Sequence, residues 1–162
     1  MKILNVKLTD PEKQIYDGDT IERVEVKLFD YTPIDFEQEE EVWPDLIQKE
    51  DGVYAKFNLR LYGIDTPEMH PHHKDAHGNK RSEESLTLEK EKAKEARQAL
   101  IDLLKETNYE FHITDAIEGK YAGRIVCRIF VNKDGKIFDI SHYLIEKGLG
   151  IPYFGGHKMP WS

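Results

Sequence analysis

Two short motifs hold the residues of this chain that are best suited to chemistry on a phosphate ester. Asp17 and Asp19 stand in Tyr-Asp-Gly-Asp-Thr, while Arg60, Asp65 and Glu68 stand in Arg-Leu-Tyr-Gly-Ile-Asp-Thr-Pro-Glu. Carboxylate oxygens are the ligands that hard divalent cations prefer, and a guanidinium grips a phosphate through paired hydrogen bonds. A fold that brings the two motifs together would support metal-assisted attack of water on a phosphodiester.

The segments that carry these motifs are predicted to pair as an antiparallel hairpin. Apolar residues recur among charged ones over 20–28, and apolar and polar residues alternate over 53–62. A period of two is typical of a strand with one buried face. A hairpin with its tip near residue 41 sets Thr20 opposite Tyr62, within one or two residues, which brings Asp19 beside the second motif.

Most of the net charge of this chain comes from one acidic segment. The whole chain carries a net charge of −8, and residues 30–51 alone hold nine acids and one base. The rest is balanced, so the charge does not exclude a nucleic-acid partner. We expect 30–51 to be an insertion at the hairpin tip. Because it also contains Val42, Trp43, Leu46 and Ile47, it either folds back on the body or binds a protein partner.

The length of 162 residues predicts a single domain spanning 1–162. The one cysteine, Cys127, lies in an alternating strand pattern and is expected to be a buried thiol. No apolar run approaches the length of a membrane span, and the first residues are too polar for a signal peptide. We therefore expect a cytoplasmic protein without a membrane partner, with secretion after processing as the alternative. We also expect a monomer.

The remaining pattern predicts an α+β domain, with helices packed on a small closed barrel. Ser82 is a good N-cap for a long helix that ends near Glu106 and has a narrow apolar stripe. The other expected elements are one or two strands over 2–16 interrupted at Asp10-Pro11, a polar loop over 67–80, strands at 109–114 and 124–131, a turn at 132–135, a short strand near 137–138, and a helix at about 139–147.

Four motifs follow one another between about residues 13 and 155: Asp-Gly-Asp-Thr, Arg-x4-Asp-Thr-Pro-Glu, Lys-Tyr-x-Gly-Arg, and a Gly-Leu that ends the last helix. Their order and spacing resemble those of staphylococcal nuclease and the thermonuclease-like domains. The resemblance implies an OB-fold-like five-stranded β-barrel with two to three packed helices. It also implies a calcium-dependent nuclease that hydrolyses DNA, RNA or both by attack of water on phosphorus, with release of the 5′-oxygen.

The resemblance assigns a single metal site to the two acidic motifs. Asp19 and Asp65 match the carboxylates that bind one calcium ion, and the backbone carbonyl of Thr66 matches a third ligand. Asp17 matches an acid that holds a metal-bound water. Other divalent cations are compatible with the same oxygen ligands.

The resemblance also assigns the catalytic and substrate-binding roles. Glu68 matches the general base, and Arg60 and Arg124 match the pair that grips the scissile phosphate. Arg128 lies on the same face of its strand as Arg124 and competes for that role. The groups expected around the terminal phosphate and the base are Lys120, Tyr121 and Tyr153.

Two alternatives stay open. The histidines after the second motif, at positions 70, 72, 73 and 77, could bind zinc, but their spacing matches no standard structural zinc site. A polar loop that touches substrate is the other interpretation. The whole domain could also be a non-catalytic OB-type module that binds nucleic acid or protein.

Overall fold

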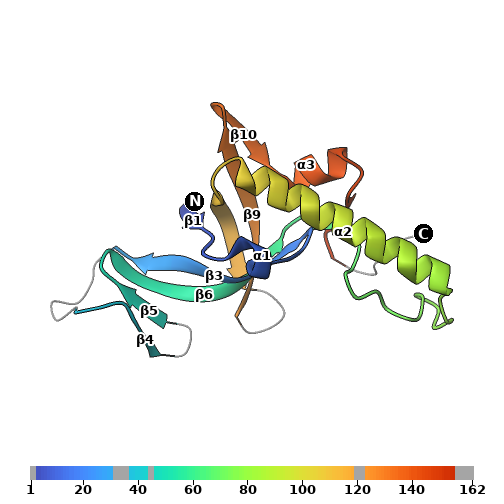
Figure 1. The fold of residues 1–162 in the computed structure, drawn as a ribbon, viewed down its shortest axis with the longest axis horizontal. Coiled ribbons are helices and arrows are strands. Elements are labelled where there is room, and N and C mark those ends of the chain that lie inside the picture. The colour runs from blue at the N-terminus through green and yellow to red at the C-terminus, as the bar shows by residue number, and fades with distance from the viewer. Residues whose placement is uncertain (1–2, 31–36, 44–45, 119–122, 156–162) are drawn as a thin grey trace.

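The predicted motif-bearing hairpin is formed by two long antiparallel strands, β3 (Thr20–Phe29) and β6 (Gly52–Leu61). The computed structural model describes residues 3–30, 37–43, 46–118 and 123–155 (Figure 1). In chain order the other elements are β1 (Leu4–Lys7), α1 (Pro11–Gln14), β2 (Ile15–Asp17), β4 (Glu40–Trp43), β5 (Leu46–Lys49), β7 (Ile64–Asp65), α2 (Glu83–Lys105), β8 (Glu110–Glu118), β9 (Arg124–Lys133), β10 (Lys136–Asp139), α3 (Ile140–Glu146) and β11 (Ile151–Pro152).

The register of the hairpin differs from the predicted one by two residues at the end that matters for the site. Thr20 pairs with Arg60 instead of Tyr62, because β3 contains two irregularities that each absorb one residue. One of them lies between Ile21 and Val24, where Arg23 adopts a left-handed φ of 52°. The backbone N–H of Arg23 donates a hydrogen bond there to Oδ1 of Asn58. Asp19 therefore lies directly beside the end of β6.

The sheet has the strand order β1-β8-β9-β6-β3-β2, and its two end strands are successive segments of the N-terminal chain. Among the described residues, no strand pairing joins β1 to β3, so the sheet is not closed. The prediction of a closed barrel is therefore wrong. Pro11 lacks an N–H and starts the one-turn helix α1, which takes this part of the chain out of the ladder. The α+β class and the OB-fold-like arrangement are confirmed.

The strand β6 is the centre of the sheet. Its first edge pairs with β3 along most of its length. The opposite edge is shared: β5 pairs with Gly52–Ala55 and β9 pairs in parallel with Asn58–Leu61. Since β5 belongs to the acidic insertion, the described part of this insertion is attached to the sheet. Lys49 of β5 also forms an ion pair with Glu25 of β3 at 2.7 Å.

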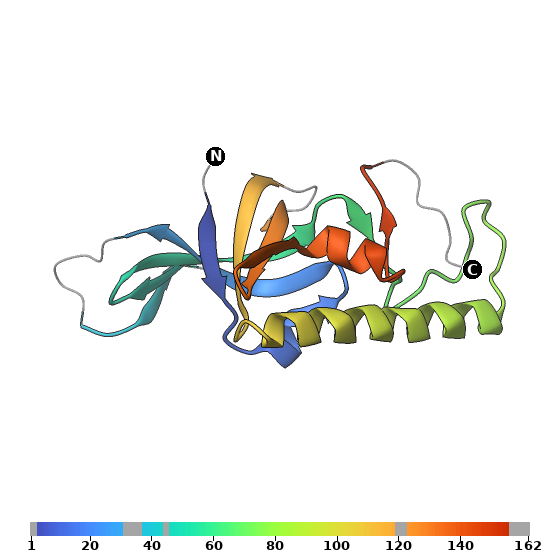
Figure 2. The same cartoon turned by 90° about the horizontal axis from the view of Figure 1, so that it is seen from above.

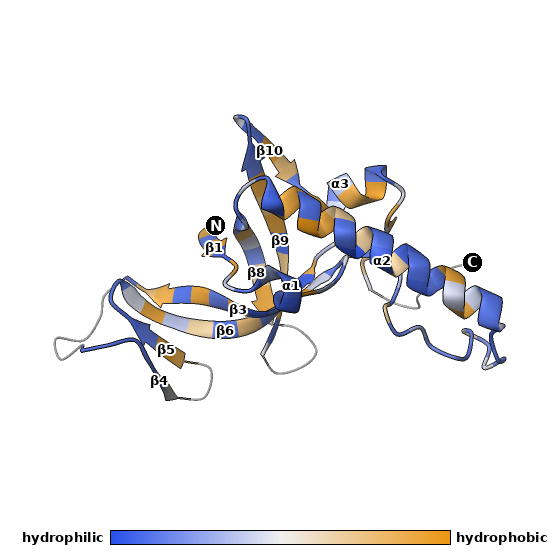
Figure 3. Ribbon diagram, viewed as in Figure 1, coloured by the Kyte–Doolittle hydropathy of each residue, from blue (hydrophilic) through white to orange (hydrophobic). Residues whose placement is uncertain are grey.

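The long helix α2 packs its C-terminal half against the sheet, and its N-terminal half extends beyond it (Figures 1 and 2). Ser82 caps it by accepting a hydrogen bond from the backbone N–H of Ser85, as expected. The predicted apolar stripe is confirmed, since its members Ala93, Ala96, Leu100, Leu103 and Leu104 are all buried. The N-terminal half is mostly hydrophilic (Figure 3). The helix α3 packs beside α2.

The predicted turn and the predicted buried thiol are confirmed. Asp134 and Gly135 both have left-handed φ angles, 52° and 77°, as the two-residue turn between β9 and β10 requires. Cys127 is fully buried, and its burial raises the pKa of the thiol to about 12. Among the described helices, none combines the length and the apolar composition needed to cross a membrane.

Candidate active site

A cleft of about 550 Å³ opens where β2, β3, β6 and β9 meet the loop that follows β7. Five of the residues singled out in the sequence line it: Asp17, Asp19, Arg60, Glu68 and Arg124. They come from four separate stretches of the chain, so the fold brings together what the sequence keeps apart. The other lining residues are Tyr16, Thr20, Glu22, Asn58 and His72.

The turn between β2 and β3 holds the first two carboxylates by tight packing. The backbone N–H of Asp19 donates to Asp17 Oδ1 at 3.1 Å. A Cβ atom added to Gly18 would lie 2.9 Å from Ala96 Cβ and 2.9 Å from Thr66 Cγ2. Only glycine fits between α2 and Thr66 without displacing one of them, and this contact seats the turn against the second motif.

The second motif lies against Asp19. Thr66 donates its backbone N–H to Asp19 Oδ2 at 2.9 Å. Arg60 is 8% exposed, and its Nη2 lies 3.4 Å from Asp19 Oδ2 and 3.7 Å from Asp65 Oδ1. Its Nη1 donates to the carbonyl of Leu61 at 2.8 Å. One buried guanidinium thus contacts carboxylates from both motifs.

The electrostatics of the cleft are dominated by its clustered acids. Burial raises the pKa of Asp17 to about 9, and the charge of Asp19 and a hydrogen bond between the two carboxyl groups contribute to the rise. Glu68 adds a smaller contribution of the same sign. Burial and the neighbouring negative charges thus disfavour the charged form of Asp17, whereas a nearby cation would favour it.

The oxygens around Asp19 are chemically suited to a calcium ion. Asp19 and Asp65 are both buried and contact the same guanidinium, and the buried Oγ1 of Thr66 has no hydrogen-bond partner in the described part of the chain. Calcium accepts carboxylate, carbonyl and hydroxyl oxygens in loose geometry and completes its shell with water. Across the described ranges, no group of three His, Cys, Asp or Glu side chains is arranged to hold a metal. The residues present therefore fit a site with two carboxylates and further neutral oxygens.

The parallel pairing of β6 with β9 separates the two candidate arginines. Arg124 pairs with Asn58, which places it on the same face of the sheet as Arg60, beside the cleft. Arg128 lies farther along β9, where its guanidinium is 3.8 Å from Asp115, 3.9 Å from Asp139 and 5.4 Å from the ring centre of Tyr62. Arg128 is not among the lining residues of the cleft.

Of the three predicted substrate-binding residues, one lies in the described part of the chain. Tyr153 donates its backbone N–H to the carbonyl of Gly63 at 3.2 Å and does not line the cleft. Lys120 and Tyr121 lie outside the described residues.

The lining residues that the sequence analysis missed are neighbours of the predicted ones. Tyr16 and Thr20 are the first and last residues of the first motif, and Glu22 and Asn58 lie two positions from Thr20 and Arg60 on the same strands. Their signal was the period of two, which turns alternate residues of a strand to one face. His72 comes from the histidine-rich loop, which supports the interpretation that this loop touches substrate.

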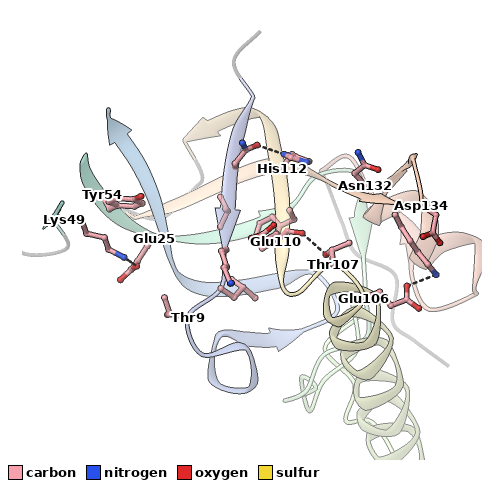
Figure 4. Close-up of a pocket in the computed structure, with 16 residues that line it drawn as sticks. Thr9, Glu25, Lys49, Tyr54, Glu106, Thr107, Glu110, His112, Asn132 and Asp134 are labelled. Carbon is pink, nitrogen blue, oxygen red and sulfur yellow. Dashed lines mark hydrogen bonds and ion pairs between the residues drawn. The ribbon is translucent and has the colours of Figure 1, made fainter. Parts of the chain in front are cut away.

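A larger cavity, of about 930 Å³, lies elsewhere on the sheet and contains none of the predicted site residues. It is lined by β1, β8 and the β9–β10 turn, among other segments (Figure 4). Two of its lysines are paired with acids: Lys133 with Glu106 at 2.7 Å and Lys49 with Glu25 at 2.7 Å. None of the acids of the smaller cleft lines it.

The comparison with protein families agrees with the resemblance drawn from the motifs. A family model described as staphylococcal nuclease homologue matches residues 58–159, a range that includes Arg60, Glu68 and Arg124. Asp17 and Asp19 precede the matched range and join the site through the β3–β6 pairing. A search of curated proteins finds no match to the chain. With the family model covering more than half of its residues, the chain belongs to the staphylococcal nuclease homologue family and has its nuclease-type fold.

Proposed function

We propose that this chain is a metal-dependent nuclease that hydrolyses phosphodiester bonds in DNA, RNA or both, with calcium as the preferred ion. The observation that carries the proposal is the cleft in which buried carboxylates, the half-buried Glu68 and two arginines meet. A binding module needs the positive charge but has no use for buried acids beside a phosphate, because they repel it.

Asp19 and Asp65, together with oxygens of Thr66, would hold the ion. When bound, a divalent cation neutralises phosphate charge and acts as a Lewis acid. The ion pairs of Arg60 with both acids keep these side chains close to one another.

Glu68 would accept the proton of the attacking water. It is half-buried, and it is the carboxylate that the loop after β7 contributes to the cleft. Arg60 and Arg124 would donate hydrogen bonds to the phosphate as its charge increases. Removing one such preorganised donor typically costs about 2.7–4 kcal/mol of transition-state stabilisation. The leaving 5′-oxygen would give products with 3′-phosphate ends.

Exposed rings continue the same face of the sheet beyond Arg60 and support a nucleic-acid substrate. Tyr62 follows Arg60 by two positions, and its ring meets the edge of Phe154 at a centroid distance of 5.7 Å. Phe154 is 73% exposed. Exposed aromatic rings near arginines are typical of surfaces that stack the bases of single strands.

A nuclease assay with single-stranded DNA, duplex DNA and RNA, each with calcium, magnesium or chelator, tests the proposal. We expect cleavage that requires the metal, and a loss of about 10²-fold or more in kcat for Glu68→Gln with little change in substrate affinity. Glu95→Gln, an exposed glutamate on α2, is the matched control and should behave as wild type. Binding of nucleic acid without metal-dependent cleavage would refute the proposal and favour the non-catalytic module.

A further inference from the structure

The loop between β7 and α2 presents two residues to the cleft, Glu68 and His72, although it has almost no regular structure. Within it, Lys74 and Lys80 form an isolated bridge, and Asp75 Oδ1 accepts the N–H groups of His77 and Asn79 at 2.9 Å each. These bonds stabilise the far tip of the loop. They do not fix the part that borders the cleft.

A buried ion pair fixes that part. Arg81 Nη1 lies 2.8 Å from Glu89 Oε1, and the two side chains are only 7% and 4% exposed. Glu89 Oε2 accepts the backbone N–H of Glu68 at 3.0 Å. The guanidinium Nη1 of Arg81 donates to the carbonyl of His72 at 3.1 Å, and the backbone N–H of Arg81 donates to the carbonyl of His73 at 2.8 Å. Each member of the pair therefore holds one flank of the loop.

The pair is itself anchored on the helix. Arg81 Nη2 donates to Ser85 Oγ at 2.9 Å, one turn into α2. Glu89 lies four residues before Ala93 and seven before Ala96, on the line of the buried apolar stripe. In the first ten residues of α2, Glu89 is the one that is buried. A charged residue thus occupies the position where an apolar one would continue the stripe.

Stability alone does not account for this arrangement. Buried ion pairs are often no more stabilising than apolar residues of similar size, because both charges lose their hydration. An apolar pair would pack the helix against the loop but would leave the N–H of Glu68 and the carbonyl of His72 without these partners. What the charged pair supplies is a defined position for the backbone on both sides of the cleft-facing segment.

We propose that Arg81 and Glu89 are positioning residues of the active site, which hold Glu68 and His72 at the cleft in the geometry needed for catalysis. This inference rests on the proposed nuclease function. A shift of about 1 Å in a catalytic group can lower turnover by about 10²-fold. The pair acts on the chemical step, because the residues proposed to bind the metal and the phosphate lie on other segments.

The test is a double variant, Arg81→Met/Glu89→Met, which removes both charges and so leaves no uncompensated one in the interior. We expect it to fold with a melting temperature close to that of wild type. The amide of Glu68 should exchange with deuterium faster, and kcat should fall about 10- to 100-fold while KM and the calorimetric calcium affinity stay unchanged. Glu91→Met, on the exposed face of α2, is the control and should change none of these values.

The single variant Glu89→Gln provides a graded comparison, because its amide oxygen can still accept the N–H of Glu68. We expect it to keep more of the amide protection and more of kcat than the double variant. The proposal is overturned if the double variant retains wild-type kcat, retains the protection of the Glu68 amide, loses only substrate affinity, or does not fold. If the wild-type protein cleaves no substrate, the nuclease proposal fails, whereas amide exchange still decides whether the pair positions Glu68.

Discussion

Gly18 joins the fold to the site, and replacing it with alanine should damage both. The added Cβ would stand 2.9 Å from Ala96 Cβ on one side and 2.9 Å from Thr66 Cγ2 on the other. Neither neighbour is the end of a flexible chain, since Ala96 is fully buried in α2 and Thr66 is fully buried beside Asp19. The turn or the second motif must therefore move.

The expected cost follows from two opposing effects. Overpacking of a core by one methyl group typically destabilises by about 1–3 kcal/mol. The lower entropy of an unfolded chain with alanine offsets about 0.4–1 kcal/mol of this. The midpoints of these ranges leave a net loss of about 1.3 kcal/mol, which corresponds to a fall of roughly 3–5 °C in Tm for a domain of this size.

The site should respond as well, because Thr66 donates its N–H to Asp19 Oδ2. Displacing Thr66 moves two of the expected calcium ligands relative to one another, so calcium affinity measured by calorimetry should fall together with Tm. A double-mutant cycle with Ala96→Gly isolates the contact: Gly18→Ala should cost less in the Ala96→Gly background. An equal cost in both backgrounds, or a rise in Tm for Gly18→Ala, would show that the packing argument is wrong.

Asp19→Asn should abolish most calcium binding in calorimetry, since it neutralises one of two charged ligands; unchanged affinity would exclude Asp19 as a ligand. Arg124→Ala should lower kcat by about 10²-fold or more while Arg128→Ala leaves it near wild type, and steady-state kinetics with the reverse order would overturn the assignment of Arg124. Burial raises the pKa of the Cys127 thiol to about 12, so between about pH 9 and 12 only the unfolded thiol loses its proton. The free energy of unfolding should therefore fall as pH rises through this range. In denaturant titrations, Cys127→Ala should remove this contribution to the pH dependence. Replacing residues 32–48 with Asn-Gly removes six acids and most of the strand β5, so stability should fall. Binding of single-stranded DNA at low salt, measured by fluorescence anisotropy, should become tighter because negative charge is removed. Weaker binding would show that the insertion contacts substrate.

The sequence predicted the hairpin, and it predicted the register at the site only to within the two residues by which Thr20 is shifted. The alternation over 53–62 is a strong local signal, and the burial of Leu59 and Leu61 follows it. The two irregularities in β3 carry no comparable signal, because Arg23 is not a residue type that favours the left-handed φ it adopts. The register is set by contacts with distant residues such as Gln14, whose side chain donates to the carbonyl of Arg23 at 2.9 Å.

The resemblance favoured Arg124 over Arg128, but the strand pattern alone does not separate them. Both point to one face of β9, since they are four residues apart on a strand. Only the parallel pairing of Asn58 with Arg124 determines which of them borders the cleft. Parallel pairing joins segments far apart in the chain, and no turn between them fixes its offset. The acids, in contrast, could be predicted as a group because each motif carries its own turn.

Glu89 is a charged residue at a helix position where the pattern predicts an apolar one. Its position continues the stripe of Ala93 and Ala96 toward the helix start, at the spacing that defines one face of a helix. A charged residue at such a position is costly to bury unless a partner is near, and Arg81 lies eight residues earlier, within reach because the loop returns to the helix there. A stripe that ends in a charge therefore indicates that the helix has left the hydrophobic core and begun to pack on polar backbone. In this chain that backbone belongs to Glu68 and His72, so the charge pattern of α2 and the geometry of the cleft have the same cause.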